Sequence, residues 1–210
     1  MIVTTQEVLQ HMTGHTGGQP QQINWQSHFT RVQQPRSGNS DALTIVDFHP
    51  SYSYSDRPDR EGRHRLTNVR VTVSMNKARS WYVAGRDTPL LLRHEQGHYN
   101  ITFLVARELC RRLLELEWDS SVLTAVGESS SQQIMHRLRS DAEQLSFNAQ
   151  AESTRLNDIY DSPGRGAKNA DGSINPGYQS HWDNIINHAI QHDTGLTILI
   201  QVSGGNPRNW

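Results

Sequence analysis

Residues 88–118 read TPLLLRHEQGHYNITFLVARELCRRLLELEW, and they carry the strongest indication of the fold. Thr88 followed by Pro89 is a strong helix start, because threonine can cap the first turn and proline needs no N–H at the first helical position. The following residues repeat at helical spacing, and one stripe holds Leu91, His94, His98, Ile101, Val105, Leu109 and Leu113. This spacing predicts one long helix that ends near Trp118.

A second long helix is predicted after the polar break at 126–133, VGESSSQQ, and should end near Tyr160, before Pro163. Its stripe contains Ile134, Leu138, Ala142, Leu145, Ala149, Glu152, Leu156 and Ile159. Residues 179–190 are expected to form a short helix. The apolar run LTILIQV at 196–202 predicts a strand.

The N-terminal half predicts strands. Residues 66–75, LTNVRVTVSM, alternate apolar and polar side chains, which is typical of an antiparallel sheet with one solvated face. Residues 42–48, ALTIVDF, predict another strand, and the polar stretch 50–65 predicts a long surface loop. Thr4 or Thr5 should cap a short helix that runs to about Met12.

Composition narrows the function classes. The chain has 210 residues, which suits one domain over 1–210, and residues 1–40 could form a loosely packed N-terminal extension. The 20 Lys and Arg residues nearly balance the 21 Asp and Glu residues, so the chain has no large net charge that would attract nucleic acid or an anionic membrane. No apolar run approaches the roughly 18 residues of a membrane span, and the start lacks a signal-peptide pattern. We therefore expect a soluble protein that is cytoplasmic, exported by a route that needs no N-terminal signal, or a mature form whose signal has been cut off. The only cysteine, Cys110, is expected to be a buried structural thiol.

Residues 94–98 read HEQGH, and on a helix His94 and His98 project from one face, one turn apart. Two neutral imidazoles at this spacing can bind one Zn²⁺ ion. Glu95 can then reach a water molecule at the ion and act as general base in hydrolysis. A chain with eleven histidines could also contain this pattern by chance, and two histidines satisfied by hydrogen bonds are the alternative.

MNKARSW, followed by LLRHEQGHYNITFLVARELCRRL, resembles the bacterial domain-of-unknown-function family 922, which is described as predicted secreted zinc-dependent proteases. Trp81, Tyr99, Ala106, Arg107 and Leu109 occupy the corresponding places of that family. The resemblance covers roughly residues 66–190, and it implies a zincin-like fold and hydrolysis of peptide bonds.

The family's second block reads Tyr-Asp, Thr-x-His-Gly and Gln-x-x-Trp. Here Tyr160-Asp161 and Gln179-x-x-Trp182 match it, whereas Asn175 stands where the family has histidine. The departure leaves the identity of the third metal ligand open.

A catalytic zinc usually has three protein ligands and one water, so a third residue must join the two histidines. Asp161 is the first candidate, because the Tyr-Asp pair is retained at a helix end. His181, next to Trp182, and Glu152, the acidic residue on the second helix, are alternatives. Tyr160 or Tyr178 could stabilise an oxyanion.

The expected fold is α+β and zincin-like, with a small antiparallel or mixed sheet packed on the HExxH helix and the second long helix. The leading hypothesis is a zinc metallopeptidase that acts on a peptide or protein substrate, with residues 66–75 as an edge strand that pairs with it. The alternatives are a metal-binding but non-catalytic binding or structural module, and an interaction protein without metal.

Overall fold

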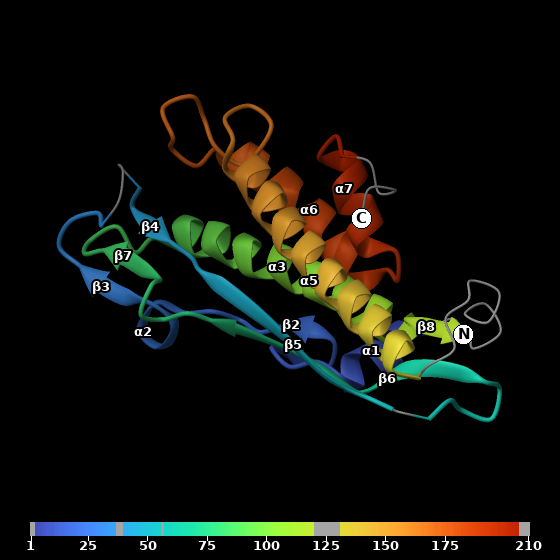
Figure 1. Ribbon diagram of the computed structural model, residues 1–210. Helices are drawn as coiled ribbons and strands as arrows, with labels where there is room; N and C mark the ends of the chain where they lie inside the picture. Colours follow the sequence, from blue (N-terminus) through green and yellow to red (C-terminus); the bar gives the residue numbers. More distant parts are fainter. Residues whose placement is uncertain (1–2, 37–39, 56, 120–130, 206–210) are drawn as a thin grey trace.

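The computed structural model describes residues 3–36, 40–55, 57–119 and 131–205, and it is built around helix α3, Pro89–Glu115. As predicted, the Thr88 side chain accepts a hydrogen bond from the backbone N–H of Leu91 and so caps this helix. Helix α3 contacts strand β6 on one side and helices α5 and α6 on the other (Figure 1). The helix is therefore buried along most of its length, which explains why its apolar residues extend beyond one stripe.

The strands form small sheets of mixed type. Strands β5 (Val46–Tyr54), β6 (Arg63–Met75) and β8 (Glu117–Asp119) form an antiparallel sheet in the order β5-β6-β8. In a second sheet, β7 (Trp81–Val83) lies between β3 (Thr30–Val32), which is parallel to it, and β4 (Ala42–Leu43), which is antiparallel. Strands β1 (His15–Thr16) and β2 (Gln19–Pro20) pair with each other. These sheets and the long helices confirm the α+β class.

Strand β6 alternates as predicted, with Val69, Val71 and Val73 buried on the face toward α3. The alternation changes phase at Asn68, which has a φ of 52°, and the register against β5 shifts at the same place. Such a bulge adds one residue to the strand and returns the preceding side chains to the buried face. Leu66 is buried for this reason, although it lies an odd number of residues from Val69.

Two predictions of local structure were wrong. The stretch 50–65 was expected to be a loop, but β5 continues to Tyr54 and β6 begins at Arg63. Pro50 is tolerated because β5 is an edge strand, where a missing N–H removes no hydrogen bond on the open side. The run 196–202 was expected to be a strand, but it forms helix α7, Gly195–Val202. Its buried apolar side chains have helical spacing and pack beside helix α6, Pro176–Gln191; they are Leu196, Leu199 and Ile200.

The second long helix is α5, Ser131–Asp161, and residues 126–130 of the predicted break lie outside the described residues. Helix α6 includes the predicted helix at 179–190. Near the N-terminus lie α1 (Thr5–Gln10), which has a capping box formed by Thr4 and Glu7, and the short helix α2 (Trp25–His28).

The described part of residues 1–40 is not the loosely packed extension that we expected. Its backbone is anchored to α3, where the Arg111 guanidinium donates a hydrogen bond of 2.8 Å to the carbonyl of Val3. Its buried side chains join the same hydrophobic core as those of α3 and α5; they are Val3, Val8, Met12, Ile23 and Phe29.

Cys110 is fully buried, as predicted, and burial raises the pKa of its thiol to about 12. Among the described residues, no helix is both long enough and apolar enough to cross a membrane.

Candidate metal centre

His94 and His98 lie one turn apart on α3 and face the C-terminal end of α5. The Nε2 atom of His94 is 2.9 Å from Oδ1 of Asp161, and the Nε2 atom of His98 is 3.3 Å from the same oxygen. These three residues form a group whose potential ligand atoms all lie within 4.8 Å of one another. With zinc–ligand distances of about 2.0–2.1 Å, tetrahedral ligands are separated by about 3.3 Å. The two measured distances are compatible with this geometry.

The other ring nitrogens of both histidines are engaged by side-chain amides. Nδ1 of His94 lies 3.1 Å from Oε1 of Gln179, and Nδ1 of His98 lies 2.7 Å from Oδ1 of Asn157. An N–H at Nδ1 that donates to oxygen leaves the lone pair of a neutral imidazole on Nε2, which is the usual arrangement for a metal-binding histidine. Both imidazoles are therefore oriented with Nε2 toward Asp161.

The orientation of both amides is set by further partners. The nitrogen of Gln179 donates to a carboxylate oxygen of Asp183 at 2.7 Å, and that of Asn157 donates to the carbonyl of Ser153 at 2.8 Å. Carboxylates and carbonyls only accept hydrogen bonds, so each amide must turn its oxygen toward a histidine. The arrangement fits a metal ion, because its outer contacts prescribe the histidine tautomer that an ion requires.

The charges at the site favour an ionised Asp161. Burial would raise the pKa of this carboxyl, but its contacts with the Nε2 atoms of His94 and His98 and the positive charges of His98 and Lys168 hold it well below its usual range. Burial would likewise lower the pKa of His98, but the hydrogen bond and negative charge of Asp161 outweigh it, so the pKa of His98 is raised. Asp161 is thus an anionic oxygen donor between two imidazoles.

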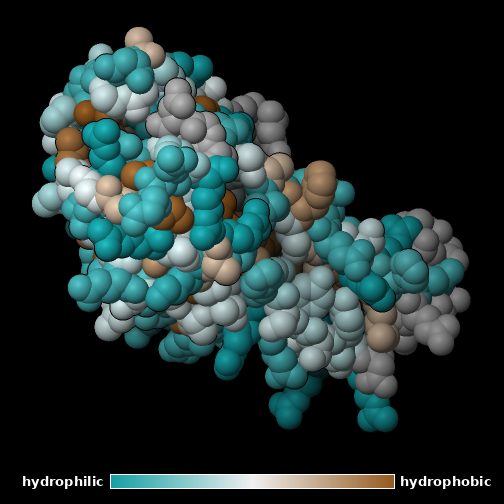
Figure 2. Space-filling view, turned by 90° about the vertical axis from the view of Figure 1, so that its left-hand side faces the viewer, coloured by the Kyte–Doolittle hydropathy of each residue, from teal (hydrophilic) through white to brown (hydrophobic). Residues whose placement is uncertain are grey.

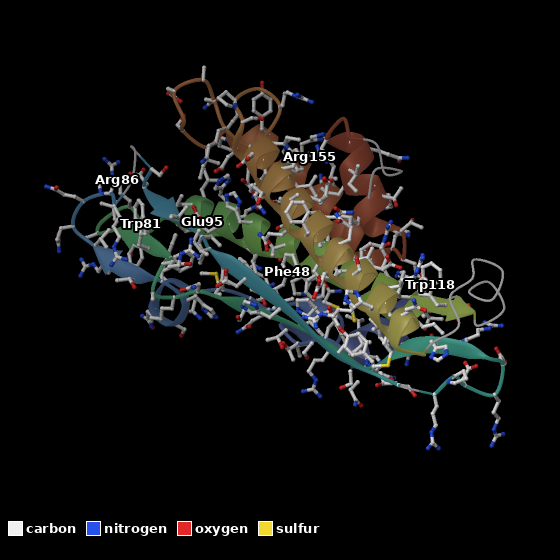
Figure 3. The ribbon with its side chains drawn as sticks, in the orientation of Figure 1. Phe48, Trp81, Arg86, Glu95, Trp118 and Arg155 are labelled. Atoms are coloured by element: carbon white, nitrogen blue, oxygen red, sulfur yellow. The ribbon has the colours of Figure 1, made fainter. Side chains whose placement is uncertain are left out.

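Glu95 is 3% exposed, and the negative charge of its carboxylate acts on the imidazole of His98. Glu95 faces two adjoining cavities of about 370 and 520 Å³, which also share Ser40, Ala42 and Lys168 as lining residues. Its carboxylate is therefore open to a molecule bound beside the histidine pair, on the part of α3 that Figure 3 labels.

Gly97 is required by the close packing of α5 against α3. A Cβ atom at this position would lie 2.2 Å from the hydroxyl oxygen of Tyr160. The Tyr160 ring stacks on His94, with centroids 4.7 Å apart, and its hydroxyl donates to the backbone carbonyl of His94. Gln96 faces away from this contact and accepts a hydrogen bond from the backbone N–H of Ile23.

Tyr160 is not placed to stabilise an oxyanion, because it is fully buried and its hydroxyl contacts Gln179 as well as His94. Burial also raises the pKa of Tyr160 far above its ordinary value. Tyr178 is 44% exposed and lines neither cavity. The structure therefore assigns neither tyrosine the role that the sequence suggested.

Of the three candidates for a third ligand, the structure brings only Asp161 to the histidine pair. His181 is exposed on α6, outside the group of potential ligands. Glu152 forms an ion pair with Arg155, at 2.6 Å, instead of facing the histidines. Asn175 caps α6, where its side-chain oxygen accepts from the N–H groups of Gly177 and Tyr178.

The wall of the cleft opposite α3 is formed by residues 42–47. The side chain of Ser80 holds this segment, because it accepts a hydrogen bond of 2.9 Å from the backbone N–H of Ile45. Trp81 next to it is almost fully buried and pairs with Leu43. Figure 2 views the end of the molecule that carries β3, β4 and β7, where hydrophilic side chains cover most of the visible surface.

No role was predicted from the sequence for Asn157 or Lys168, and Gln179 was identified only as part of a matched block. Asn157 could have been found, because Ser153, Asn157 and Asp161 recur at four-residue spacing on α5 and form a polar stripe. Gln179 stood in the matched Gln-x-x-Trp block. Lys168 carries no local signal, since it lies in the loop between α5 and α6.

No family model, curated protein or solved structure matches this chain.

Proposed function

We propose that this protein is a zinc-dependent peptidase with a zincin-like fold. The observation that carries the proposal is the convergence of His94, His98 and Asp161 next to Glu95, a buried residue whose side chain lines both cavities. The resemblance of HEQGH and its neighbours to the family of predicted zinc-dependent proteases supports the same conclusion. Of the residues in that resemblance, Tyr160 and Gln179 contact His94, and Trp182 packs against Tyr160.

Two imidazoles and one carboxylate are a common donor set for a catalytic zinc and leave a coordination position open. When bound, zinc would act as a Lewis acid that lowers the pKa of a water molecule to near neutrality and polarises the substrate carbonyl. The remaining chemistry belongs to Glu95. It accepts the proton of the water that attacks the carbonyl carbon, and it returns a proton to the amine nitrogen as the C–N bond breaks.

The proposed substrate is an extended peptide that lies in the two cavities on either side of Glu95. We expected residues 66–75 to pair with it, but this expectation was wrong. Strand β6 is covered by β5 on one side, and the backbone of His11 and Thr13 hydrogen-bonds to Val71 on the other. We propose β4 instead, because it lies at the edge of its sheet and Ala42 lines both cavities.

The test is to compare the wild-type protein with the Glu95→Gln and His98→Ala variants. Wild-type protein should bind one zinc ion and cleave unfolded casein or a quenched fluorescent peptide pool. Glu95→Gln should retain zinc and lose at least about 100-fold in kcat, since a general base contributes on this order. His98→Ala should lose zinc as well. An active Glu95→Gln variant would remove the catalytic assignment.

A non-catalytic metal-binding module would need all coordination positions filled by protein. The group found among the described residues has three potential ligands, which favours an open position. Metal analysis of protein purified without added zinc tests the remaining alternative, an interaction protein without metal, because stoichiometric zinc is incompatible with it.

A further inference from the structure

Lys168 contacts the candidate metal centre from the loop between α5 and α6. Its Nζ atom lies 2.7 Å from Oδ1 of Asp161, the oxygen that both histidines approach. The backbone on each side of it is fixed, because the N–H of Ala167 donates to the carbonyl of Tyr160 and the N–H of Asn169 donates to the carbonyl of Ser173. The loop therefore holds this ammonium group beside the third ligand.

Lys168 is also placed to meet a molecule in the cleft. Among the described residues, Glu95 and Lys168 are the two charged side chains that line both cavities. Two arginines also line the cleft, but each lines only one of the cavities; they are Arg79 and Arg86. Arg86 also forms an ion pair with Asp41, in which its Nε atom lies 3.6 Å from Oδ1 of the carboxylate. A group at the junction of the two cavities thus encounters one carboxylate and one ammonium.

The charges indicate what the ammonium binds. In this structure it shares Asp161 with both imidazoles. A dication held by the same carboxylate would repel the ammonium, and the side chain would then be stabilised by an anion in the cleft. Lysine suits this role because its charge is carried on a flexible four-carbon chain.

We propose that Lys168 stabilises the oxyanion formed on the scissile carbonyl, a role that rests on the proposed peptidase function. When the water oxygen bonds to the carbonyl carbon, the π electrons of the C=O bond move to its oxygen, and Lys168 donates a hydrogen bond to it. Glu95 holds the proton taken from the water and passes it to the leaving nitrogen. Lys168 keeps its own proton throughout, so all atoms and charges balance.

The position of Lys168 between the cavities also indicates the substrate class. A lysine that binds the terminal carboxylate of a peptide would be expected at the closed end of a pocket. Lys168 instead lies where the two cavities adjoin, so that peptide can extend to both sides. The geometry therefore favours an endopeptidase that cleaves internal bonds. One cavity offers Leu90, Leu91 and Ile174 to apolar side chains of the substrate.

The kinetic test uses Lys168→Met, which keeps the length of the side chain and removes its charge. Removing one oxyanion donor typically lowers kcat about 100- to 1000-fold, and KM should change by less than about threefold. Zinc affinity, measured by chelator competition, should be at least as high as in the wild type. Lys168→Arg should recover part of kcat. Lys77→Met is the control, because Lys77 lines neither cavity and donates to the carbonyl of Gln26.

A binding test without turnover separates this inference from the proposed function. An N-phosphorylated leucyl dipeptide, whose tetrahedral group carries the negative charge of the oxyanion, is titrated calorimetrically into zinc-loaded Glu95→Gln protein. In this Glu95→Gln background, the additional substitution Lys168→Met should weaken binding of the dipeptide at least about tenfold. The additional substitution Lys77→Met should leave the binding unchanged.

Equal binding, unchanged kcat or loss of zinc in Lys168→Met would each overturn the role of Lys168. A wild-type protein that cleaves no peptide would count against the proposed function, and the calorimetric comparison would still decide the case of Lys168.

Discussion

Replacing Gly97 by alanine should destabilise the protein, although the same change inside an exposed helix would stabilise it by about 1 kcal/mol. The added Cβ would lie 2.2 Å from the hydroxyl oxygen and 2.5 Å from Cζ of Tyr160. Ordinary contacts begin near 3.4 Å, so the ring would have to move by more than 1 Å. Tyr160 is fully buried and hydrogen-bonded at its hydroxyl, so this movement has no free space to use.

The magnitude follows from two opposing effects. Overpacking of a core costs about 1–3 kcal/mol, and weakening of the Tyr160 hydrogen bonds costs about 1 kcal/mol more. The gain in helix propensity offsets about 1 kcal/mol. The free energy of unfolding should therefore fall by about 1–3 kcal/mol. Zinc affinity should fall about tenfold as well, because the Tyr160 ring stacks on His94 and its hydroxyl contacts Gln179.

Urea unfolding of the zinc-free protein measures the first effect, and chelator competition measures the second. Ser140→Ala, at an exposed position of α5, controls for helix propensity and should be neutral or slightly stabilising. In a Tyr160→Leu background, Gly97→Ala should cost less than in the wild type. A Gly97→Ala variant that is as stable as the wild-type protein and binds zinc equally well would show that the contact with Tyr160 does not require glycine.

Two further predictions concern the contacts of His98. Asn157→Leu removes the acceptor at Nδ1 of His98 and should lower zinc affinity about 10- to 100-fold by chelator competition, whereas an unchanged affinity would contradict its orienting role. Because the pKa of His98 is raised in the metal-free protein, zinc must displace a proton from part of the population near neutral pH. Zinc affinity should therefore increase as the pH rises through the pKa of His98, and calorimetry in buffers of different ionisation enthalpy should detect proton release that grows as the pH is lowered. Proton uptake would be inconsistent with the assignment.

The helices were predictable from the sequence to the extent that their signals are local. The cap at Thr88 and the spacing of apolar residues predicted α3 to within a few residues of its end at Glu115. The alternation of Val69, Val71 and Val73 predicted the buried face of β6. The sequence did not reveal the bulge at Asn68, because a phase change depends on the register of the partner strand.

The errors arose where a short segment is compatible with two structures. LTILIQV has the composition of a buried strand, yet it forms α7 because its apolar residues pack on α6. Residues 50–54 and 63–65 of the polar stretch became strand because the first segment pairs with β6 and the second with β8, and both pairings are non-local interactions. Local propensity is too weak to decide such cases against tertiary contacts.

The helix that carries HEQGH and the common face of His94 and His98 could be predicted from the sequence, because both follow from the 3.6-residue period of one element. The residues that surround the two histidines depend on tertiary packing. Asp161 lies 67 residues from His94 in the chain, and Gln179 lies 85 residues from it. The packing of α5 and α6 against α3 brings these side chains together, and it selects Asp161 over His181 and Glu152. The position of Lys168 likewise depends on how one loop folds back over the end of α5, which no local pattern encodes.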